Sequence, residues 1–486
     1  MAASDRRKTY ICVWILCFLY VLPLIIANRY VYDDTQRVFY HTAGWALDGR
    51  PLTELLIKLL CGANQFIYDI FPLPLLLSVT AYAAVSVRWC EDYFLRFGAT
   101  AVITAFLPFS MPLFLANLSY RFDCIGFTAS VVLLMIPFIY RKNVWWKGIL
   151  AGIACVLASM CFYQPTVGLF AGLAVLTAYG SYLRKEQFLK RLAGDAASFV
   201  SGTAVYKLVV SEIFVDRQDW RADAKNFALS SDMIGNAGLK IKLILQLLER
   251  FARSVGARQL LLYAAIWILG GIAVIYCLKE RKRAQAAIGI AAFCVLPVLL
   301  PLAAVLPMMA LSASYALPRQ QTALMAVMFL LAGCLAAASQ RFPRAALCLG
   351  VLTVLFHFSF SYAYGNLMRE QKEYEEMIVY GIICDIDDNV SSEIDNIAVE
   401  GEIPFSPVVE STCRIMPVFA DMVPEGFDGD GMLGGAIINH YSRDIFSIVD
   451  ITVADRQFMD ENEPFAKSRE YELYLNGGRI CVRFTD

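Results

Sequence analysis

The sequence YICVWILCFLYVLPLIIA at residues 10–27 decides the fold class, and it follows the basic residues Arg6, Arg7 and Lys8. An uncharged run of this length is about what a helix needs to cross the hydrocarbon layer of a membrane. A signal peptide is the competing interpretation, but the run is long and no small-x-small cleavage site precedes the polar segment at Asn28. We therefore predict a first spanning helix whose basic end stays in the cytoplasm.

Similar apolar runs recur along the chain, which is 58% hydrophobic and has a mean hydropathy of +0.55. A soluble protein of 486 residues does not need this much apolar content. We predict an all-α polytopic membrane protein of about eleven transmembrane helices. The expected spans lie at about 9–27, 70–88, 97–116, 124–140, 148–162, 166–183, 196–215, 259–278, 286–306, 320–338 and 345–362.

Basic residues gather in the short connections on one side of these spans. Together with the N-terminus, those connections hold 18 basic residues: Arg6, Arg7 and Lys8; Arg88 and Arg96; Arg141, Lys142 and Lys147; Arg184, Lys185, Lys190 and Arg191; Lys279, Arg281, Lys282 and Arg283; Arg341 and Arg344. Short basic loops stay in the cytoplasm. Eleven spans from a cytoplasmic start then place the C-terminal part on the opposite side of the membrane.

The opposite side carries two long loops, Asn28–Gln65 and Asp216–Arg258. Each contains an amphipathic stretch, at Leu52–Leu60 and at Lys240–Arg253, of the kind that lies on a membrane surface. The other outer loops are short, at Asn117–Asp123, Phe162–Pro165 and Pro307–Arg319.

The chain divides by charge into two predicted domains, 1–362 and 363–486. Residues 363–486 hold 25 acidic and 9 basic side chains, a net charge of −16, whereas the rest holds 18 and 33, a net charge of +15. Within this acidic tail we expect a small α+β domain. Its predicted elements are a helix at Asn366–Ser391, a strand at Ile394–Val399, a helix at Ser406–Val423 and a hairpin at Tyr471–Phe484 around Asn476-Gly477-Gly478.

Most of the 14 cysteines lie within apolar runs, where they are typical of small core side chains. Cys384, Cys413 and Cys481 lie in the acidic tail, where one disulfide with one cysteine left over could form, between a pair that the sequence leaves open. No metal-ligand spacing occurs, so no metal and no cofactor are expected.

The most informative polar stretch follows the first span. It contains Asp33-Asp34, then Arg37, and then Gly44-Trp45-Ala-Leu-Asp-Gly-Arg50-Pro51. Two adjacent carboxylates near a low-dielectric surface raise one pKa, which suits a general base. Arg37 and Arg50 could bind a phosphate through paired hydrogen bonds. The alternative interpretation is a solvated loop with ordinary interface charges.

Three further segments place polar groups at the outer ends of spans. Asn117-Leu-Ser-Tyr-Arg121-Phe-Asp123 puts two ionisable groups in a very short loop, where such groups usually face a cavity or pair with each other. Arg319 stands at the entrance of a span, where it could bind phosphate or extend to the interface. Tyr163 and Gln164 occupy a short outer turn.

Lys207 lies inside the seventh predicted span, where it could bind an anion or extend to the interface.

Two other patterns carry less weight. Gly429-Asp-Gly431-Met-Leu-Gly434 fits G-x-G-x-x-G, but it follows no predicted strand, so we expect a loop there rather than a nucleotide site. His41, His357 and His440 are far apart in the sequence, which argues against a histidine metal site or a Ser-His-Asp triad. His41 follows the Asp pair closely and is a candidate for lining the site.

The order of these motifs resembles the type II serotype-converting O-antigen glucosyltransferases of bacteria. The shared elements are the first span, the outer Asp33-Asp34 with a following Arg, the Gly44–Pro51 segment and the Asn117–Asp123 segment. The resemblance implies a GT-C architecture in the bacterial inner membrane, with the C-terminal domain in the periplasm. It implies a polyprenyl-phosphate sugar as donor, typically undecaprenyl-phosphate glucose, and a lipid-linked O-antigen or related surface glycan as acceptor. No nucleic-acid partner is expected.

The resemblance also implies roles for residues. Asp33 or Asp34 would deprotonate the acceptor hydroxyl while the other orients it, in a single inverting displacement. The candidate donor-phosphate ligands are Arg37, Arg50, Arg121 and Arg319. Asp123 would orient Arg121 or contact a sugar hydroxyl.

Three other functions compete with this interpretation. A transporter or flippase of lipid-linked sugars would place charges near the bilayer midplane, and Pro297, Pro301 and Pro307 could break a helix there. An O-antigen polymerase or ligase would share the location without the early Asp pair. A membrane scaffold would use the acidic domain to bind a partner.

Overall fold

A computed structural model describes residues 2–63, 65–91, 94, 97–139, 145–215, 232–310, 317–390, 394, 396–424, 431–442 and 446–485. The chain forms two compact units. The first unit comprises Met1–Pro23, Gly44–Ala63 and Ile70–Tyr362. The second comprises Leu24–Ala43, Asn64–Asp69 and Ala363–Asp486. The predicted basic residues Arg96, Arg141 and Lys142 lie outside the described ranges.

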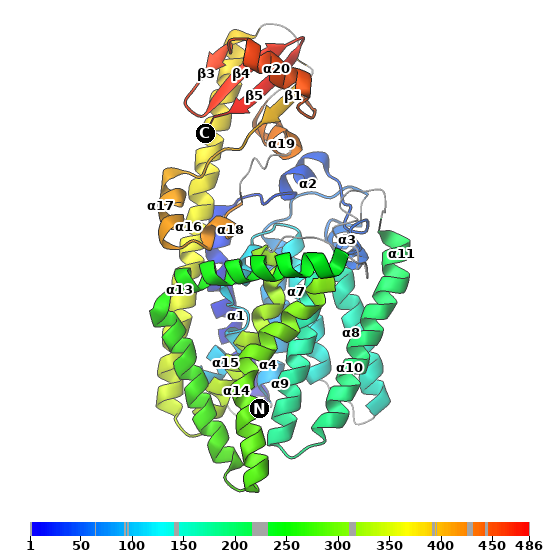
Figure 1. Cartoon of the computed structure of the whole chain (residues 1–486), viewed down its shortest axis with the longest axis vertical. Helices are drawn as coiled ribbons and strands as arrows, with labels where there is room; N and C mark the ends of the chain where they lie inside the picture. The colour runs from blue at the N-terminus through cyan, green and yellow to red at the C-terminus, as the bar shows by residue number, and fades with distance from the viewer. Residues whose placement is uncertain are drawn as a thin grey trace. The chain divides into compact units, whose positions relative to one another are not determined.

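The first unit is built from apolar helices, most of which run side by side in Figure 1. Within the described residues, nine helical segments are long and apolar enough to cross a membrane. They are Ala3–Ala27 (α1), Leu73–Cys90 (α4), Trp145–Phe162 (α8), Gln164–Leu183 (η2 and α9), Phe188–Phe214 (α10, η3 and α11), Gly238–Leu278 (in α13), Arg283–Val305 (α14), Pro318–Ser339 (η5 and α15) and Pro343–Asn389 (α16). These segments correspond to nine of the eleven predicted spans.

The outer surfaces of these helices are apolar. Leu261 on α13 is 67% exposed and Val298 on α14 is 63% exposed. Because a water-soluble surface does not present large apolar side chains in this way, hydrocarbon must cover them. The chain is therefore a polytopic α-helical membrane protein, as the sequence predicts.

The two remaining predicted spans differ from the others. The span predicted at 124–140 is α7, Asp123–Ile139, which has 17 residues and is about 25 Å long at the usual rise of an α-helix. The span predicted at 97–116 is not one helix. It consists of α5 (Ala99–Phe106), a turn, the 3-10 helix η1 (Pro112–Phe114) and α6 (Leu115–Leu118). Pro108 and Pro112 remove backbone donors at this break, which explains why the helix stops.

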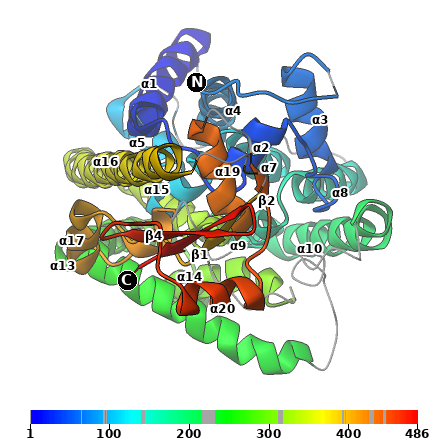
Figure 2. The same ribbon diagram turned by 90° about the horizontal axis from the view of Figure 1, so that it is seen from above.

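Two helices of the first unit contain the stretches that were predicted to be amphipathic. α3 spans Pro51–Leu60, as expected from Leu52–Leu60. The Lys240–Arg253 stretch lies in α13, Asp232–Leu278, whose backbone breaks at Gly256 with φ 74°. The limb before Gly256 runs crosswise to the bundle helices in Figure 1 and lies lengthwise in the end-on view of Figure 2. Residues 216–231 of the second long loop lie outside the described residues.

The second unit contains a five-stranded sheet with the order β2-β1-β5-β4-β3. Its strands are Asn396–Glu400 (β1), Ser447–Ile448 (β2), Ala466–Lys467 (β3), Tyr471–Asn476 (β4) and Arg479–Phe484 (β5). β1 pairs in parallel with β2 and β5, while β4 pairs antiparallel with β5 and β3. The predicted hairpin is confirmed, with Gly477 and Gly478 at positive φ in its two-residue turn.

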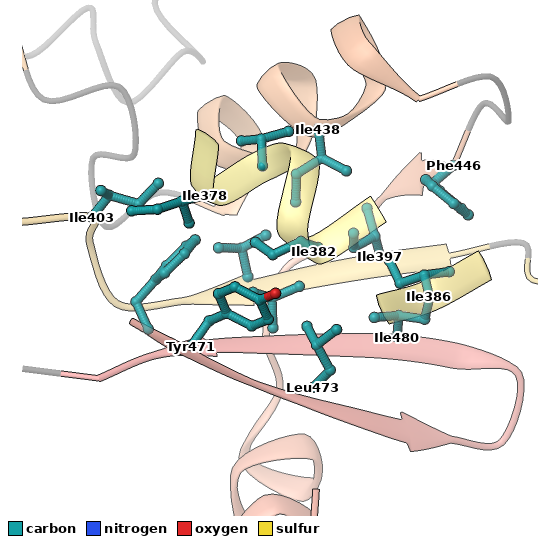
Figure 3. Packing of buried hydrophobic residues seen from close by; sticks show 14 residues of the cluster. Ile378, Ile382, Ile386, Ile397, Ile403, Ile438, Phe446, Tyr471, Leu473 and Ile480 are labelled. Atoms are coloured by element: carbon teal, nitrogen blue, oxygen red, sulfur yellow. The ribbon is translucent and has the colours of Figure 1, made fainter. Parts of the chain in front are cut away.

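Helices cover this sheet and share its core. They are the end of α16, Gly431–Tyr441 (α19) and Val453–Glu461 (α20). Asp34–Tyr40 (α2) contacts α19, and Pro407–Ile415 (α17) contacts Phe419–Met422 (α18). Isoleucines of α16, α19, β1 and β5 pack together in Figure 3 with Leu473 and Tyr471 of β4. This mixed sheet with its helices agrees with the predicted α+β domain.

Several local expectations for the second unit are corrected. The helix predicted at Ser406–Val423 is two helices, because the chain turns between Ile415 and Phe419. The short helix α2 in the first outer loop was not predicted. The segment Gly431–Gly434, expected to be a loop, begins α19, while Gly429 and Asp430 lie outside the described residues. Cys384, Cys413 and Cys481 are free thiols, so the disulfide considered above does not form.

Candidate functional site

A polar cluster in the first unit is built on the broken segment that precedes α7. Every residue from Ala101 to Thr128 is buried. Inside a membrane, irregular backbone is tolerated only where protein covers it or where it lines a cavity. The broken segment therefore delivers polar backbone and charged side chains, including Arg121, into the interior of a membrane protein. Arg121 is 5% exposed, and its guanidinium lies 4.9 Å from the centre of the Phe71 ring.

Asp123 joins this segment to the outer loop. Its Oδ1 accepts a hydrogen bond from Trp45 Nε1 over 2.9 Å and from Arg50 Nη1 over 3.2 Å. Asp123 is 2% exposed and is the first residue of α7, where the helix dipole favours a carboxylate. Trp45 is fully buried. The Arg50–Asp123 ion pair thus fixes the Gly44–Pro51 segment against the start of α7.

Tyr163 links Arg50 to Arg319. The Arg50 guanidinium lies 5.0 Å from the centre of the Tyr163 ring. The Tyr163 hydroxyl donates to the Arg319 carbonyl oxygen over 3.1 Å, and Asn117 Nδ2 donates to the same oxygen over 3.0 Å. The Arg319 guanidinium stacks 5.4 Å from the Tyr120 ring and donates to the Tyr120 hydroxyl. The buried Tyr163 thereby contacts the Arg50 guanidinium and the Arg319 backbone, while the Arg319 guanidinium lies against Tyr120.

Gln164 holds the backbone of the Gly44–Pro51 segment. Its Nε2 donates to the Asp48 carbonyl oxygen over 2.9 Å and to the Tyr206 hydroxyl over 2.7 Å. The Tyr206 hydroxyl in turn donates to the Gly49 carbonyl oxygen over 2.8 Å. Tyr206 begins a five-residue π-helix, Tyr206–Val210 (η3), an irregularity that is frequent at functional sites. Lys207 is the next residue of this π-helix and is half-buried.

Glu54 on α3 fixes the start of the same segment. Its Oε2 accepts from the Ala46 amide over 2.9 Å and from the Gly44 amide over 3.3 Å, and its Oε1 accepts from Lys58 over 2.6 Å. Burial alone would raise the pKa of the Glu54 carboxyl. The hydrogen bonds from Lys58 and from the two amides outweigh burial and hold the pKa below its ordinary value. Glu54 therefore stays ionised and keeps the segment in place.

The acidic motif and its neighbours belong to the second unit. Asp33 precedes α2, its side chain is 41% exposed, and its Oδ2 accepts from Arg37 Nη2 over 3.0 Å. Asp34 is fully buried, and its Oδ2 accepts from the Val31 amide over 3.2 Å. His41 ends α2 in the left-handed region with φ 54°, and its Nδ1 lies 3.0 Å from the Ile67 carbonyl oxygen. The two adjacent carboxylates thus have different surroundings.

The predicted site residues fall into two groups. Arg50, Asp123, Tyr163, Gln164 and Arg319 are joined by the contacts above within the first unit. Asp33 and Arg37 form an ion pair within the second unit. Sequence reasoning missed three members of the cluster, Trp45, Tyr120 and Tyr206. The sequence could have indicated Trp45 and Tyr120, because these residues lie within the Gly44–Pro51 and Asn117–Asp123 motif segments. Tyr206 lies in an apolar run, where no sequence motif indicates it.

The cluster contains an excess of positive charge among the residues that define it. Arg50, Arg121 and Arg319 contribute three guanidinium groups, which remain protonated in proteins, and Asp123 contributes one carboxylate. Within the described ranges, no three histidine, cysteine or carboxylate side chains form a group that could hold a metal ion. The cluster is therefore suited to an anionic group such as a phosphate.

Comparisons with known proteins agree with the order of the motifs. The family model "Glucosyl transferase GtrII" matches residues 22–336, which include the Asp pair and every member of the arginine-containing cluster. An uncharacterized 55.3 kDa protein in the gtrB 5′ region of Salmonella phage P22 is 23% identical over 498 aligned residues, covering all of both chains. No solved structure matches the chain. The chain belongs to the GtrII glucosyl transferase family and is a membrane-embedded glycosyltransferase.

Proposed function

We propose that this glycosyltransferase moves glucose from a polyprenyl-phosphate donor to an O-antigen or related surface glycan at the periplasmic face of the bacterial inner membrane. The observation that carries the proposal is that the first unit of a membrane protein holds three arginines beside aromatic rings, a buried Arg121 and the partly buried Arg50 and Arg319. A soluble nucleotide-sugar enzyme has no need to place phosphate-binding groups among membrane-spanning helices. A donor whose phosphate carries a polyprenyl chain does need this arrangement.

The arginines would act on the leaving group. Arginine binds phosphate oxygens through paired, charge-assisted hydrogen bonds. During transfer, the bond from the anomeric carbon to the phosphate oxygen breaks and the polyprenyl phosphate leaves with the electron pair. Negative charge grows on the phosphate as the sugar becomes oxocarbenium-like, so guanidinium groups already in place stabilise the transition state.

The acceptor hydroxyl needs a base, and we assign this role to Asp33. The resemblance offers Asp33 and Asp34 as alternatives. Asp34 is fully buried and accepts the Val31 amide, which is a structural contact at the start of α2. Asp33 has a side chain that is 41% exposed, so a hydroxyl can reach it. In a single inverting displacement the acceptor oxygen bonds to the anomeric carbon as the phosphate leaves, and the proton of the acceptor hydroxyl passes to the base.

The distribution of charge supports the proposed periplasmic location of the reaction. The N-terminal Arg6, Arg7 and Lys8 precede α1, and basic ends of this kind stay in the cytoplasm. Asp33 follows the other end of α1. The candidate base would then lie on the periplasmic side, where lipid-linked glycans are exposed.

The test is transfer of radiolabelled glucose from undecaprenyl-phosphate glucose to lipid-linked surface glycan by the purified full chain. Asp33→Asn should lower turnover by roughly two to four orders of magnitude. Asp34→Asn should retain measurable turnover and lose thermal stability instead. Asp450→Asn, an exposed aspartate of the same unit, serves as the control and should match the wild type. Wild-type turnover in Asp33→Asn would remove Asp33 as the base.

A further inference from the structure

The second unit contains a pocket that the proposed chemistry does not use. It is a small hollow of about 40 Å³ that is partly open to solvent, so a ligand would enter it with one edge. Three parts of the chain line it: the segment that leads into α2, the middle of α16, and α19 together with Pro424, which follows α18. The lining residues are Arg29, Tyr30, Tyr32, Thr35, Lys372, Glu375, Glu376, Pro424, Ile437, His440 and Tyr441.

One wall of the pocket is a rigid buried ion pair. Arg29 is 5% exposed, and its Nη2 lies 2.8 Å and 2.9 Å from the two carboxylate oxygens of Glu375. Arg29 also donates to the Pro424 carbonyl oxygen over 2.6 Å, and Gln371 donates to Glu375 over 3.0 Å. Burying a charged pair is costly, and these hydrogen bonds offset much of the cost, although Arg29 Nε has no hydrogen-bond partner among the described residues. This wall is therefore held in one geometry.

The other walls are aromatic. The Tyr30 and His440 rings meet edge to face at 5.3 Å, and the His440 and Tyr441 rings meet in the same way at 4.8 Å. Tyr32 has φ 48°, a left-handed conformation that is rare for a bulky residue and that clusters at ligand sites. The Tyr441 hydroxyl donates to Glu376 over 2.5 Å. Three tyrosines and a histidine thus surround carboxylates that can accept further hydrogen bonds.

The charges of the pocket balance. Arg29 and Lys372 are offset by Glu375 and Glu376, and Lys372 lies 3.6 Å from Glu376. A phosphate or other anion would find no excess positive charge here, in contrast to the arginine cluster of the first unit. A large apolar ligand would cover fixed carboxylates at high desolvation cost. The chemistry that fits is neutral, rich in hydroxyl groups and able to pack C–H faces against aromatic rings.

We propose that this pocket binds a neutral saccharide, namely a sugar unit of the acceptor glycan. Sugar hydroxyls donate to the Glu375 and Glu376 carboxylates, and the ring C–H groups pack on Tyr30, His440 and Tyr441. The assignment rests on the proposed function, because it takes the acceptor to be a glycan. It gives the second unit the role of holding the acceptor chain.

The experiment is a calorimetric titration of the full chain in nanodiscs with oligosaccharide released by mild acid from the surface glycan of the strain that carries the protein. Tyr30→Ala and Tyr441→Ala should each weaken binding by roughly tenfold, as loss of an aromatic anchor usually does. Tyr441→Phe keeps the ring and should show a smaller loss, which guards against misfolding as the explanation. Tyr380→Ala, an exposed tyrosine of α16 outside the pocket, should bind like the wild type.

The outcomes separate this inference from the proposed function. Selective loss of saccharide binding in the pocket variants supports the pocket assignment. It does so even if the wild type transfers no glucose from undecaprenyl-phosphate glucose, in which case only the donor proposal fails. Normal transfer by the wild type, with the binding constant and acceptor KM unchanged in both alanine variants, overturns the pocket assignment alone. Absence of saccharide binding by the wild type, or saturable binding of inorganic phosphate in the pocket, also overturns it.

Discussion

The indole nitrogen of Trp45 donates to Asp123 Oδ1 over 2.9 Å, and Arg50 donates to the same oxygen over 3.2 Å. One carboxylate at the start of α7 therefore orients an aromatic ring and a guanidinium that lie 78 and 73 residues away in the sequence. If Arg50 binds the donor phosphate as proposed, Asp123 would act on the donor through the position of Arg50.

Trp45→Phe tests this orientation. The substitution keeps an aromatic ring in the core but removes the indole donor, so the buried Asp123 loses one partner. We expect a loss of about 1–3 kcal/mol in stability and a raised KM for the lipid-linked donor. Thermal unfolding in detergent and donor titration measure the two effects. Trp146→Phe, at an exposed tryptophan on α8, is the control, and equal effects in both variants would remove the special role of Trp45.

Tyr163 should carry two separable contributions. Tyr163→Phe removes the hydrogen bond to the Arg319 carbonyl oxygen and keeps the ring beside Arg50. Tyr163→Leu removes both. We expect Tyr163→Phe to cost about 0.5–1.5 kcal/mol in stability, the usual value of one hydrogen bond, and Tyr163→Leu to lower transfer much further. Identical transfer rates for the two variants would show that the ring contact with Arg50 does not contribute.

Gly49→Ala should displace the side chains that hold the outer segment. A Cβ at this position would lie 2.4 Å from the Tyr206 hydroxyl and 3.0 Å from Gln164 Nε2, and φ at Gly49 is 74°. Gly44→Ala is a matched control, because Gly44 also has positive φ but a Cβ there would meet no atom within 4 Å. Both variants carry backbone strain of about 1–3 kcal/mol. We expect only Gly49→Ala to lose transfer beyond its loss of stability, and similar activities in the two variants would contradict this.

Acid should loosen the C-terminal hairpin through Asp455. Burial alone would raise the pKa of the Asp455 carboxyl, but hydrogen bonds from Thr452 and the charge of Arg479 outweigh it and lower the pKa. A carboxylate with a lowered folded-state pKa stabilises the fold above its unfolded value of about 3.9, and this contribution is lost as the pH falls through the lowered pKa. The exchange protection of β4 and β5 should therefore decrease below about pH 4.

Asp455→Asn provides the check on this prediction. The variant should be less protected near neutral pH, because the ion pair with Arg479 at 2.9 Å is lost, and it should show a flatter decline in acid. Asp450→Asn should follow the wild type. Hydrogen exchange measured by mass spectrometry on peptides of residues 471–484 gives the answer. A decline of the same steepness in Asp455→Asn and wild type would show that other groups set the acid sensitivity.

Much of the fold follows from the sequence because its signals are local. Runs of about twenty apolar residues identify most spans, and Asn476-Gly477-Gly478 identifies the hairpin. The prediction of a spanning helix at residues 97–116 was wrong, because apolar content does not distinguish a spanning helix from a buried irregular segment. Pro108 and Pro112 were the available signal for that break.

The candidate site was only partly predictable. The motifs identify Arg50, Asp123 and Arg319 as candidates, because charged residues beside spans are costly and need partners. Which residues pair depends on contacts across 73 or more positions, such as Arg50 with Asp123, and no local pattern encodes such a contact. The pocket of the second unit was not predicted for the same reason, since its walls come from segments that begin at residue 29 and end at residue 441.

The most direct test of the arginine cluster compares wild type with Arg50→Gln in transfer of radiolabelled glucose, with undecaprenyl-phosphate glucose and UDP-glucose supplied as alternative donors. The account predicts transfer by the wild type from the lipid-linked donor and not from UDP-glucose. Arg50→Gln should lose roughly two to three orders of magnitude in kcat/KM for the lipid-linked donor, as expected for loss of a charge-stabilising group. Transfer from UDP-glucose alone, or wild-type kcat/KM in Arg50→Gln, would contradict the account.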